Sequence, residues 1–355
     1  MTGLWTWWVY LGGWLTYNTN TNTPKKKQKK QVRLELQRPE NTSCSSTNPQ
    51  TQPQGQGWAI TALLSPEGEE VPLRRPVRFN GATPVREWLA TLEAQMRITL
   101  AHALAGALRA RGEEKGEEDL ATWAGKYPAQ VVILALQVQW TDGVERALAA
   151  KNAAKALAEG PLAALEALLR ASAQSSSSAE GAGGEGNDAL LRRKLEQAIT
   201  VAVQQRDATR ALLARAQEEA GESMTGRPPH QQAFEWLRQL RFYWSPPPPG
   251  EVDKDDDDGT ALLAALTVRM ADAAFPYGFE YLGVGERLVQ TPLTDRCYLT
   301  LTQALHHGMG GNPFGPAGAC VRACLFLGLV GMYVTRHTTG ASTSPWLRDR
   351  RSNPS

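Results

Sequence analysis

The chain has 355 residues, and 38 Lys and Arg against 36 Asp and Glu leave a formal net charge of +2. This balance creates no global field that would favour nucleic acid or an anionic membrane as the partner. The length suffices for about two domains, and the four scattered cysteines are too few for a disulfide framework, which favours a reducing, intracellular compartment.

The first 57 residues are predicted to be a disordered or spurious N-terminal extension. Residues 2–17 are rich in Trp and Tyr and carry no charge; they lack the basic start of a signal peptide and are short for a membrane span. An interfacial anchor is the alternative, helped by the basic run at 25–30. A nuclear-localisation or nucleic-acid patch would also explain this run, but no aromatic interleaving or helical stripe follows it, so we interpret it as a solvated charge run. Polar residues dominate 18–57, so little apolar surface offsets the ordering entropy of this segment.

Order is expected from residue 58 onward. The pattern predicts a strand or buried turn over 58–64 and a polar turn over 65–73. A Thr-Pro pair at 83–84 favours a helix start, because the hydroxyl suits the N-cap and proline suits the first helical position. Apolar residues then recur at helical spacing as far as Gly112, so a long helix with one buried face is predicted.

The helical pattern continues through the middle of the chain. Further helices are predicted over 127–148, over 153–169 with a break or kink at Gly160-Pro161, and from about 188. A Ser/Gly-rich stretch over 174–187 is expected to be a flexible insert. The next elements are predicted as an aromatic helix over 232–244, a solvated acidic loop over 253–258, and a strand or amphipathic piece over 262–270.

Near the C-terminal end lies the first half of a phosphate-binding loop. The full motif, G-x-x-x-x-G-K-[ST], uses glycines to let backbone N–H groups curl round phosphates, lysine to reach the β- and γ-phosphates, and a hydroxyl to ligate Mg²⁺. In the frame that starts at Gly315, Cys320 replaces the last glycine, Val321 the lysine and Arg322 the hydroxyl residue. The motif therefore begins in this chain and is not completed.

Longer motifs carry a family resemblance. They are FEYLG at 279–283, RLVQTPLTDRCYLT at 287–300 and GGNPFGPAG at 310–318, with KYPAQ at 126–130, LRRKLE at 191–196 and FEWL at 234–237 upstream. Together they resemble the heavy chains of dynein over about residues 58–318. The residues of these motifs are most similar to those of the cytoplasmic dynein 1 class, and axonemal heavy chains share many of them.

The resemblance implies a fold and a division into domains. It implies a mainly α protein in which a helical linker bundle at 58–250 is followed by an incomplete α/β segment of the P-loop NTPase type at 251–318, the start of the first AAA+ module. Residues 319–355 form a divergent tail. In this family the linker is a lever that swings across an AAA+ ring, and the first module is the main ATPase of a motor that moves toward microtubule minus ends.

The resemblance also assigns binding residues and partners. One set lies beside the adenine and a second begins the phosphate loop: Leu288, Val289, Pro292, Leu293, Thr294, then Gly315, Pro316, Ala317 and Gly318. ATP with Mg²⁺ is the implied cofactor, and no catalytic or metal-ligating residue is assigned. Microtubules and dynein intermediate and light chains are the implied partners, through regions outside this chain, with no nucleic acid and no membrane. The implied location is the cytoplasmic cytoskeleton, or a cilium for an axonemal chain.

The departure from the family pattern follows Gly318. The family continues with Thr-Gly-Lys-Thr, whereas this chain continues with Ala-Cys-Val-Arg, which we interpret as a truncation by mis-spliced or translated non-coding sequence. Without the lysine and the metal, the charge that develops on the γ-phosphate has no protein partner, so hydrolysis by this chain alone is not expected. The alternative function is a non-catalytic helical interaction or scaffold protein with a dynein-like segment.

Other chemical sites are set aside. Cys320 and Cys324 have no second Cys/His pair at zinc spacing. His306 and His307 are interpreted as surface residues at a helix end, and a metal site at this pair is set aside because neighbours on a helix point about 100° apart. We expect a folded helical core over 80–245 and an unstable segment after 270, because the AAA+ sheet that would cover the apolar side of 301–305 is missing.

Overall fold

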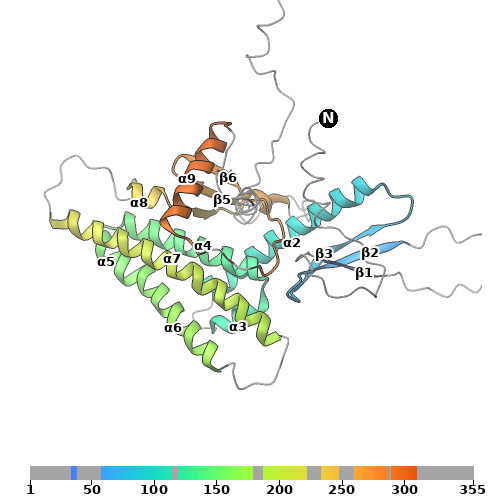
Figure 1. Cartoon of the computed structure of the whole chain (residues 1–355), viewed down its shortest axis with the longest axis horizontal. Coiled ribbons are helices and arrows are strands. Elements are labelled where there is room, and N and C mark those ends of the chain that lie inside the picture. Colours follow the sequence, from blue (N-terminus) through green and yellow to red (C-terminus); the bar gives the residue numbers. More distant parts are fainter. Residues whose placement is uncertain are drawn as a thin grey trace, which may run out of the picture.

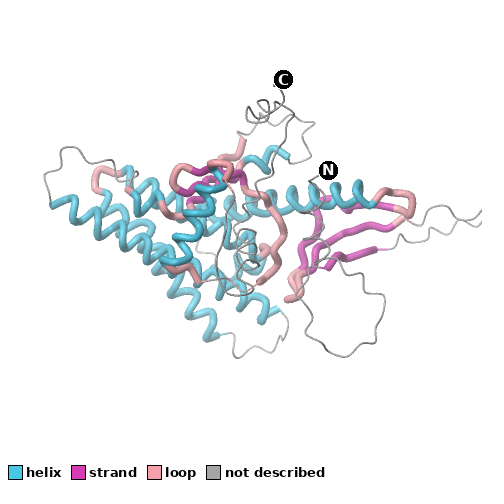
Figure 2. Tube along the Cα trace, turned by 45° about the horizontal axis from the view of Figure 1, so that its top comes forward, coloured by secondary structure: helices cyan, strands magenta, loops and turns pink. Residues whose placement is uncertain are grey.

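The computed structural model describes residues 33–37, 57–113, 119–178, 187–221, 233–247, 260–285, 287 and 289–309. Within these ranges the protein is mainly helical with two small antiparallel sheets, which confirms the predicted fold class (Figures 1 and 2). The long helices form the body, and one sheet extends from an end of that body alongside the first turns of α2 (Figure 1). No helix in these ranges combines the length and the hydropathy needed to cross a membrane.

The extended sheet contains β1 (Arg33–Gln37), β2 (Trp58–Leu64) and β3 (Glu70–Phe79) in the order β1-β2-β3. The strand predicted over 58–64 is confirmed, and β3 begins inside the expected turn because its apolar residues alternate toward the core. The prediction of disorder is wrong for Arg33–Gln37, which pairs antiparallel with β2. The prediction rested on composition, which cannot show that a neighbouring strand is available for backbone hydrogen bonds.

The helices of the body follow the predicted periodicity. α2 (Val85–Glu113) ends where expected, and α3 (Leu120–Lys126) leads into α4 (Ala129–Ala149). α4 lies at the centre: it is buried nearly all round, as expected for a helix that other elements cover on several sides. α7 (Asn187–Gly221) is the longest helix of the described ranges and packs along α4 and α6.

The predicted kink at Gly160-Pro161 is confirmed in a specific form. α5 (Ala153–Leu157) continues through one turn of π-helix (Ala158–Leu162) into α6 (Ala163–Ser178). Proline has no N–H to donate and its ring crowds the preceding turn, so the helix accommodates it by widening locally. α6 reaches into the expected insert at 174–187, and residues 179–186 of that insert lie outside the described ranges.

The helix predicted over 232–244 is wrong. The segment forms a single helical turn, α8 (Phe234–Leu237), followed by strand β4 (Arg241–Trp244). β4 pairs with β5 (Leu266–Met270), which pairs with β6 (Ala273–Pro276), after a 3₁₀ turn at Thr260–Ala264. The backbone N–H of Phe242 donates to the Thr141 hydroxyl on α4 at 3.0 Å, so tertiary pairing outweighs local propensity here.

One hydrophobic core joins most of these elements. Buried side chains from β2, β3, α2, α4, α7, β4, β5 and the segment 277–281 form a single cluster. A second cluster surrounds Trp140 and Trp236, whose rings meet edge to face with centroids 5.2 Å apart. The expected domain boundary at 250/251 therefore crosses a shared core, and Phe275, Tyr277 and Phe279 are buried after residue 270, where we expected instability to begin.

Candidate functional site

Residues 277–285, here called the strap, connect β6 to the segment that carries the predicted nucleotide-binding residues. Tyr277, Phe279 and Tyr281 alternate along the strap and are all buried in the main core. The rings of Tyr277 and Phe279 pack edge to face with centroids 5.0 Å apart. Two left-handed residues, Phe279 (φ 49°) and Gly283 (φ 64°), shape its backbone.

Gln130, in the first turn of α4, makes three hydrogen bonds to the strap. Its Nε2 donates to the Tyr277 hydroxyl at 2.9 Å and to the Glu280 carbonyl at 2.7 Å. Its Oε1 accepts from the Leu282 backbone N–H at 3.0 Å. A single buried amide thus satisfies donors and acceptors of a segment without regular secondary structure, which would otherwise lose its bonds to water on burial.

Two further helices hold the strap at its ends. Arg97 of α2 donates from Nε to the Gly278 carbonyl at 2.7 Å. Gln197 of α7 donates from Nε2 to the Gly285 carbonyl. Since α2, α4 and α7 all contribute, the strap is fixed against three separate helices of the body.

A buried ion pair ties the strap to the β2–β3 turn. Glu69 accepts from the Tyr281 hydroxyl at 2.9 Å through Oε2, and from the Ala129 N–H at the start of α4 at 2.8 Å through Oε1. Lys194 of α7 places Nζ 3.0 Å from the Glu69 carboxylate and donates to the Tyr127 carbonyl at 2.7 Å. Both charged side chains are buried, so each depends on the other for its electrostatic compensation.

Burial shifts the proton equilibria along the strap. It raises the pKa of Tyr277 to about 12, and burial together with the Glu69 carboxylate raises the pKa of Tyr281 further. The pKa of Glu280 rises to about 7, first through burial and then through the nearby Glu93 carboxylate, although Arg97 acts in the opposite direction. Both tyrosines therefore remain neutral at physiological pH, Tyr277 as an acceptor from Gln130 and Tyr281 as a donor to Glu69.

α9 (Pro292–His306) begins shortly after the strap, and its first turn is capped by two threonines. The Thr291 hydroxyl accepts from the Thr294 N–H at 3.3 Å, and the Thr294 hydroxyl accepts from the Thr291 N–H at 3.2 Å. Pro292 occupies the first turn, where its missing N–H costs nothing. Gln290 donates from Nε2 to Asp295 Oδ1 at 2.7 Å, which closes the loop before the helix.

The structure brings together part of the predicted binding set. Val289 and Leu293 lie on either side of the α9 start with 65% and 72% of their surface exposed, beside Pro292 and Thr294. Leu288 and the predicted phosphate-loop residues lie outside the described ranges: Gly315, Pro316, Ala317 and Gly318.

The residues present fit one part of a nucleotide better than another. Two exposed apolar side chains beside a rigid helix start suit the face of a purine ring. Among the described residues no group of three or more His, Cys, Asp or Glu could hold a metal ion. The described residues therefore fit the base of ATP, and the predicted phosphate loop, which would meet the phosphates and Mg²⁺, lies outside the described ranges.

The two histidines at the C-terminal end of α9 lie at the surface, as predicted. His306 is the last residue of the helix, and His306 and His307 are both exposed, which confirms their place at the surface of a helix end. Leu305 and Tyr298 pack against Phe275 of β6, and Gln303 donates from Nε2 to the Met270 carbonyl at 3.1 Å. Cys320 and Cys324 lie outside the described ranges.

Sequence reasoning missed the residues that hold the strap. Gln130 ends the KYPAQ motif and Lys194 lies within LRRKLE, so both occur in stretches that carry the resemblance. Their roles were not visible, because the groups that they contact lie far away in sequence. A polar residue at an otherwise apolar helix position was the one local signal, since α4 is buried at Gln130 and at the apolar residues that follow it.

Comparison with known proteins shows similarity to dynein heavy chains. Residues 277–321 match the family model described as "Hydrolytic ATP binding site of dynein motor region". The chain is 40% identical over 265 residues to the "Dynein heavy chain, cytoplasmic" of Drosophila melanogaster and 36% identical over 261 residues to that of Dictyostelium discoideum. It is 37% identical over 261 residues to "Cytoplasmic dynein 2 heavy chain 1" of Tripneustes gratilla. Each match covers 73% of this chain and 5% of the relative.

Proposed function

This chain carries a segment of a dynein heavy chain, and from that premise we propose that the segment joins a helical lever to the ATP site of a dynein-type motor. The helical body corresponds in this proposal to the linker, and the strap with the start of α9 to the beginning of the first AAA+ module. Movement along microtubules, and assembly with intermediate and light chains in the cytoplasmic cytoskeleton, belong to the proposal for the complete motor.

The single observation that carries the proposal is the fixation of the strap immediately before the residues predicted to meet the nucleotide. The family match begins at residue 277, at the first residue of the strap. Hydrogen bonds from α2, α4 and α7 hold the strap, so a displacement of the α9 start pulls on the helical body through a short, bonded connection. Such a connection suits a lever that follows the state of an ATP site.

The start of α9 has the role of a base-binding surface in this proposal. Val289 and Leu293 cover one face of the adenine, and the capped helix start keeps them in place. ATP supplies the phosphate-transfer chemistry when it is bound, whereas this chain has Val321 and Arg322 where the family's lysine and hydroxyl stand. We therefore propose that the chain binds ATP weakly through the base and does not hydrolyse it.

Equilibrium dialysis with ATP tests the base-binding role. The unmodified chain is expected to bind ATP weakly, and the double variant Val289→Asp/Leu293→Asp is expected to lose at least tenfold in affinity. Val85→Asp is the matched control, since Val85 is also an exposed apolar residue, at 62%, on another helix. Equal losses in the control and the double variant would contradict a base site at α9.

A rebuilt phosphate loop gives the second arm. The variant Ala319→Thr/Cys320→Gly/Val321→Lys/Arg322→Thr restores the family sequence after Gly318. It is expected to bind ATP at least tenfold more tightly than the unmodified chain, because lysine and backbone N–H groups then meet the phosphates. Phosphate release by the unmodified chain above the rate of buffer alone would overturn the proposal that it is inactive.

A further inference from the structure

Arg287 lies between the strap and α9 and is a partly buried cation. Among the described residues, no hydrogen bond or ion pair engages its guanidinium. Burial lowers the pKa of this guanidinium, and Tyr298 and Tyr277 act in the opposite direction. The two tyrosines therefore lie within electrostatic range of Arg287. A cation that leaves water without a counter-ion destabilises the chain unless an anion compensates it.

β6 and α9 place the two tyrosines close together. Tyr277 directly follows β6 and continues its pairing, because its N–H donates to the Leu266 carbonyl at 2.9 Å. Phe275 and Tyr277 are two residues apart in this extended segment, so their side chains project from the same face of the sheet. Tyr298 of α9 packs against Phe275. The end of β6, the second turn of α9 and the side chain of Arg287 thus meet at one place.

The Tyr277 hydroxyl is the second observation that points to a ligand. Its oxygen accepts from Gln130 Nε2 at 2.9 Å, and within the described part of the chain its O–H proton has no acceptor. Only 5% of Tyr277 is exposed, so water cannot readily replace that acceptor. An oxyanion between Tyr277 and Arg287 would accept two parallel N–H bonds from the guanidinium and a third bond from the hydroxyl.

Two acids lie near the tyrosines, and neither pairs with Arg287 among the described contacts. Asp295 acts on Tyr298, but its carboxylate already accepts from Gln290 Nε2 at 2.7 Å. Glu280 acts on Tyr277, and its pKa of about 7 leaves it mostly uncharged at lower pH. Below pH 7 the local field around the guanidinium therefore favours an anion.

We infer that Arg287 and Tyr277 bind a phosphate group, with the guanidinium and the phenol hydroxyl donating to its oxygens. A phosphate presents three or more acceptor oxygens, so it can use all three donors, whereas a carboxylate has only two oxygens. Inorganic phosphate and the phosphates of a nucleotide share this chemistry. The site uses neither the base surface of Val289 and Leu293 nor the predicted phosphate loop, so it goes beyond the proposed function.

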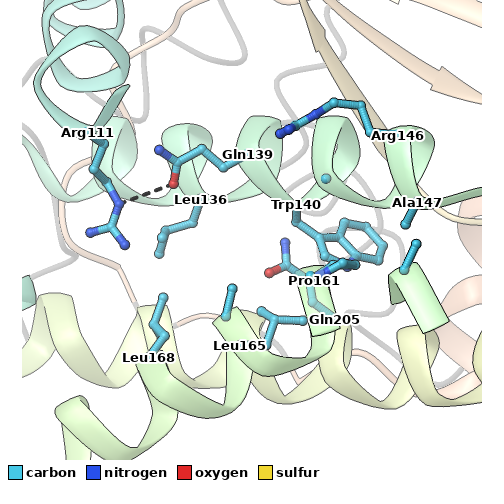
Figure 3. Close-up of a pocket in the computed structure, with 14 residues that line it drawn as sticks. Arg111, Leu136, Gln139, Trp140, Arg146, Ala147, Pro161, Leu165, Leu168 and Gln205 are labelled. Carbon is cyan, nitrogen blue, oxygen red and sulfur yellow. Dashed lines mark hydrogen bonds between the residues drawn. The ribbon is translucent and has the colours of Figure 1, made fainter. Parts of the chain in front are cut away.

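Arg111 is the contrasting case of an arginine with partners. It lines a cavity of about 510 Å³ between α4, the α5–α6 segment and α7 (Figure 3). Its Nε donates to Gln139 Oε1 at 3.2 Å, and its guanidinium lies 4.7 Å from the centre of the Trp123 ring. Arg111→Met is therefore expected to lower the thermal midpoint of the chain. Arg287→Met removes a cation without a partner and is expected to raise the midpoint in phosphate-free buffer.

Phosphorus NMR and calorimetry with inorganic phosphate test the site on the full chain at pH 6.5. Phosphate is expected to bind the unmodified chain and to raise its thermal midpoint. Arg287→Met is expected to weaken binding by at least about tenfold, and Tyr277→Phe, which keeps the ring, by about fivefold. Arg296→Met is the matched control, because Arg296 is exposed on α9 and its loss changes the net charge equally. This control is expected to change binding by less than about twofold.

ATP and adenosine identify the source of the phosphate group. For a nucleotide phosphate, Arg287→Met weakens ATP binding and leaves adenosine binding unchanged. For free phosphate, the variant loses inorganic phosphate and binds ATP and adenosine as before. Either result supports the site, and the variant Val289→Asp/Leu293→Asp reports on the base surface separately.

Three results would overturn the inference. They are an unmodified chain that does not bind inorganic phosphate, a loss in Arg296→Met equal to that in Arg287→Met, and a lower midpoint of Arg287→Met in phosphate-free buffer. The last result would show that the guanidinium supports the fold and does not await an anion.

Discussion

At the residue scale, the carboxylate of Glu69 determines how the strap meets the body. It bonds to the Tyr281 hydroxyl, to the N–H of Ala129 and to the ammonium group of Lys194. Glu69 itself lies in the turn after β2, where its N–H donates to the Ser65 hydroxyl at 3.1 Å. The buried Glu69 carboxylate thus connects the β2–β3 turn to the start of α4, to α7 and to the strap. Among the described residues, Lys194 is its counter-ion.

Replacement of Lys194 by Met is expected to be strongly destabilising. The change leaves the Glu69 carboxylate buried without its counter-ion, which costs about 3–5 kcal/mol in the free energy of unfolding. The double variant Glu69→Gln/Lys194→Met is expected to recover most of that loss, because a neutral amide needs no counter-ion. Urea denaturation followed by circular dichroism measures both.

An exposed pair between α5 and the π-helical turn that follows it serves as the control for this prediction. Lys155 and Glu159 are 3.9 Å apart with most of both side chains in solvent. Lys155→Met is therefore expected to change the free energy of unfolding by less than about 0.5 kcal/mol. A loss in Lys194→Met no greater than in Lys155→Met would show that the buried pair contributes nothing specific.

Glu280 gives the fold a pH dependence with a defined sign. Its pKa is raised to about 7 by burial and by Glu93, so between the ordinary carboxyl pKa and pH 7 the folded state holds more protons than the unfolded state. The free energy of unfolding must therefore fall as pH rises through this window, and level off above it. Because part of the side chain is in solvent, we expect a fall of roughly 1–2 kcal/mol.

Glu280→Gln is expected to abolish this contribution and to stabilise the chain above pH 7. Urea midpoints measured from pH 4.5 to 8 would show the slope reduced in this variant. Glu87→Gln, an exposed position on α2, should retain the slope of the unmodified chain. A Glu280→Gln profile parallel to that of the unmodified chain would contradict the assignment.

At the scale of elements, the local sequence pattern predicted the long helices correctly, but it failed for a segment whose structure depends on contacts with residues distant in sequence. The apolar spacing of α2, α4 and α7 is visible in sequence because each helix buries a continuous stripe or its whole surface. The segment 241–244 continues the aromatic pattern from which we predicted a helix, yet it forms strand β4. It pairs with β5, which begins 25 residues later, and the Phe242 N–H donates to the Thr141 hydroxyl on α4. Those partners lie outside any local window.

The backbone conformation of the strap requires glycine at position 283. Its φ of +64° is strained for any residue with a side chain, and an added Cβ would lie 3.0 Å from the Ser65 Cβ. Gly283→Ala is expected to lower the free energy of unfolding by about 1–2 kcal/mol. Gly285→Ala is the matched control in the same strap, because nothing lies within 4 Å of its added Cβ and its φ is not positive. Equal thermal midpoints for the two variants would contradict the strain argument.

At the scale of the molecule, the strap and the helical body form one packing unit. The sequence led us to expect a boundary near residue 250, because the family resemblance divides a linker from an AAA+ module there. Phe279 and Leu266 are fully buried in the same cluster as Leu100 and Val131, so burial continues across that boundary. Patterns in sequence predict which residues are apolar, but not which distant apolar residues share a core, so the packing of the strap against the helical body could not be predicted from the sequence.

Hydrogen exchange tests whether the body and the strap open together. In the unmodified chain, amides at 277–285 are expected to exchange with the same opening free energy as those of α4, because both belong to one core. Gln130→Leu removes three hydrogen bonds and strands buried groups of the strap, so the strap should then exchange at least tenfold faster while α7 stays protected. Gln137→Leu on the same helix is the control, with no expected change. Uniform loss of protection over α4, α7 and the strap in Gln130→Leu would show that Gln130 supports the whole core and not the joint.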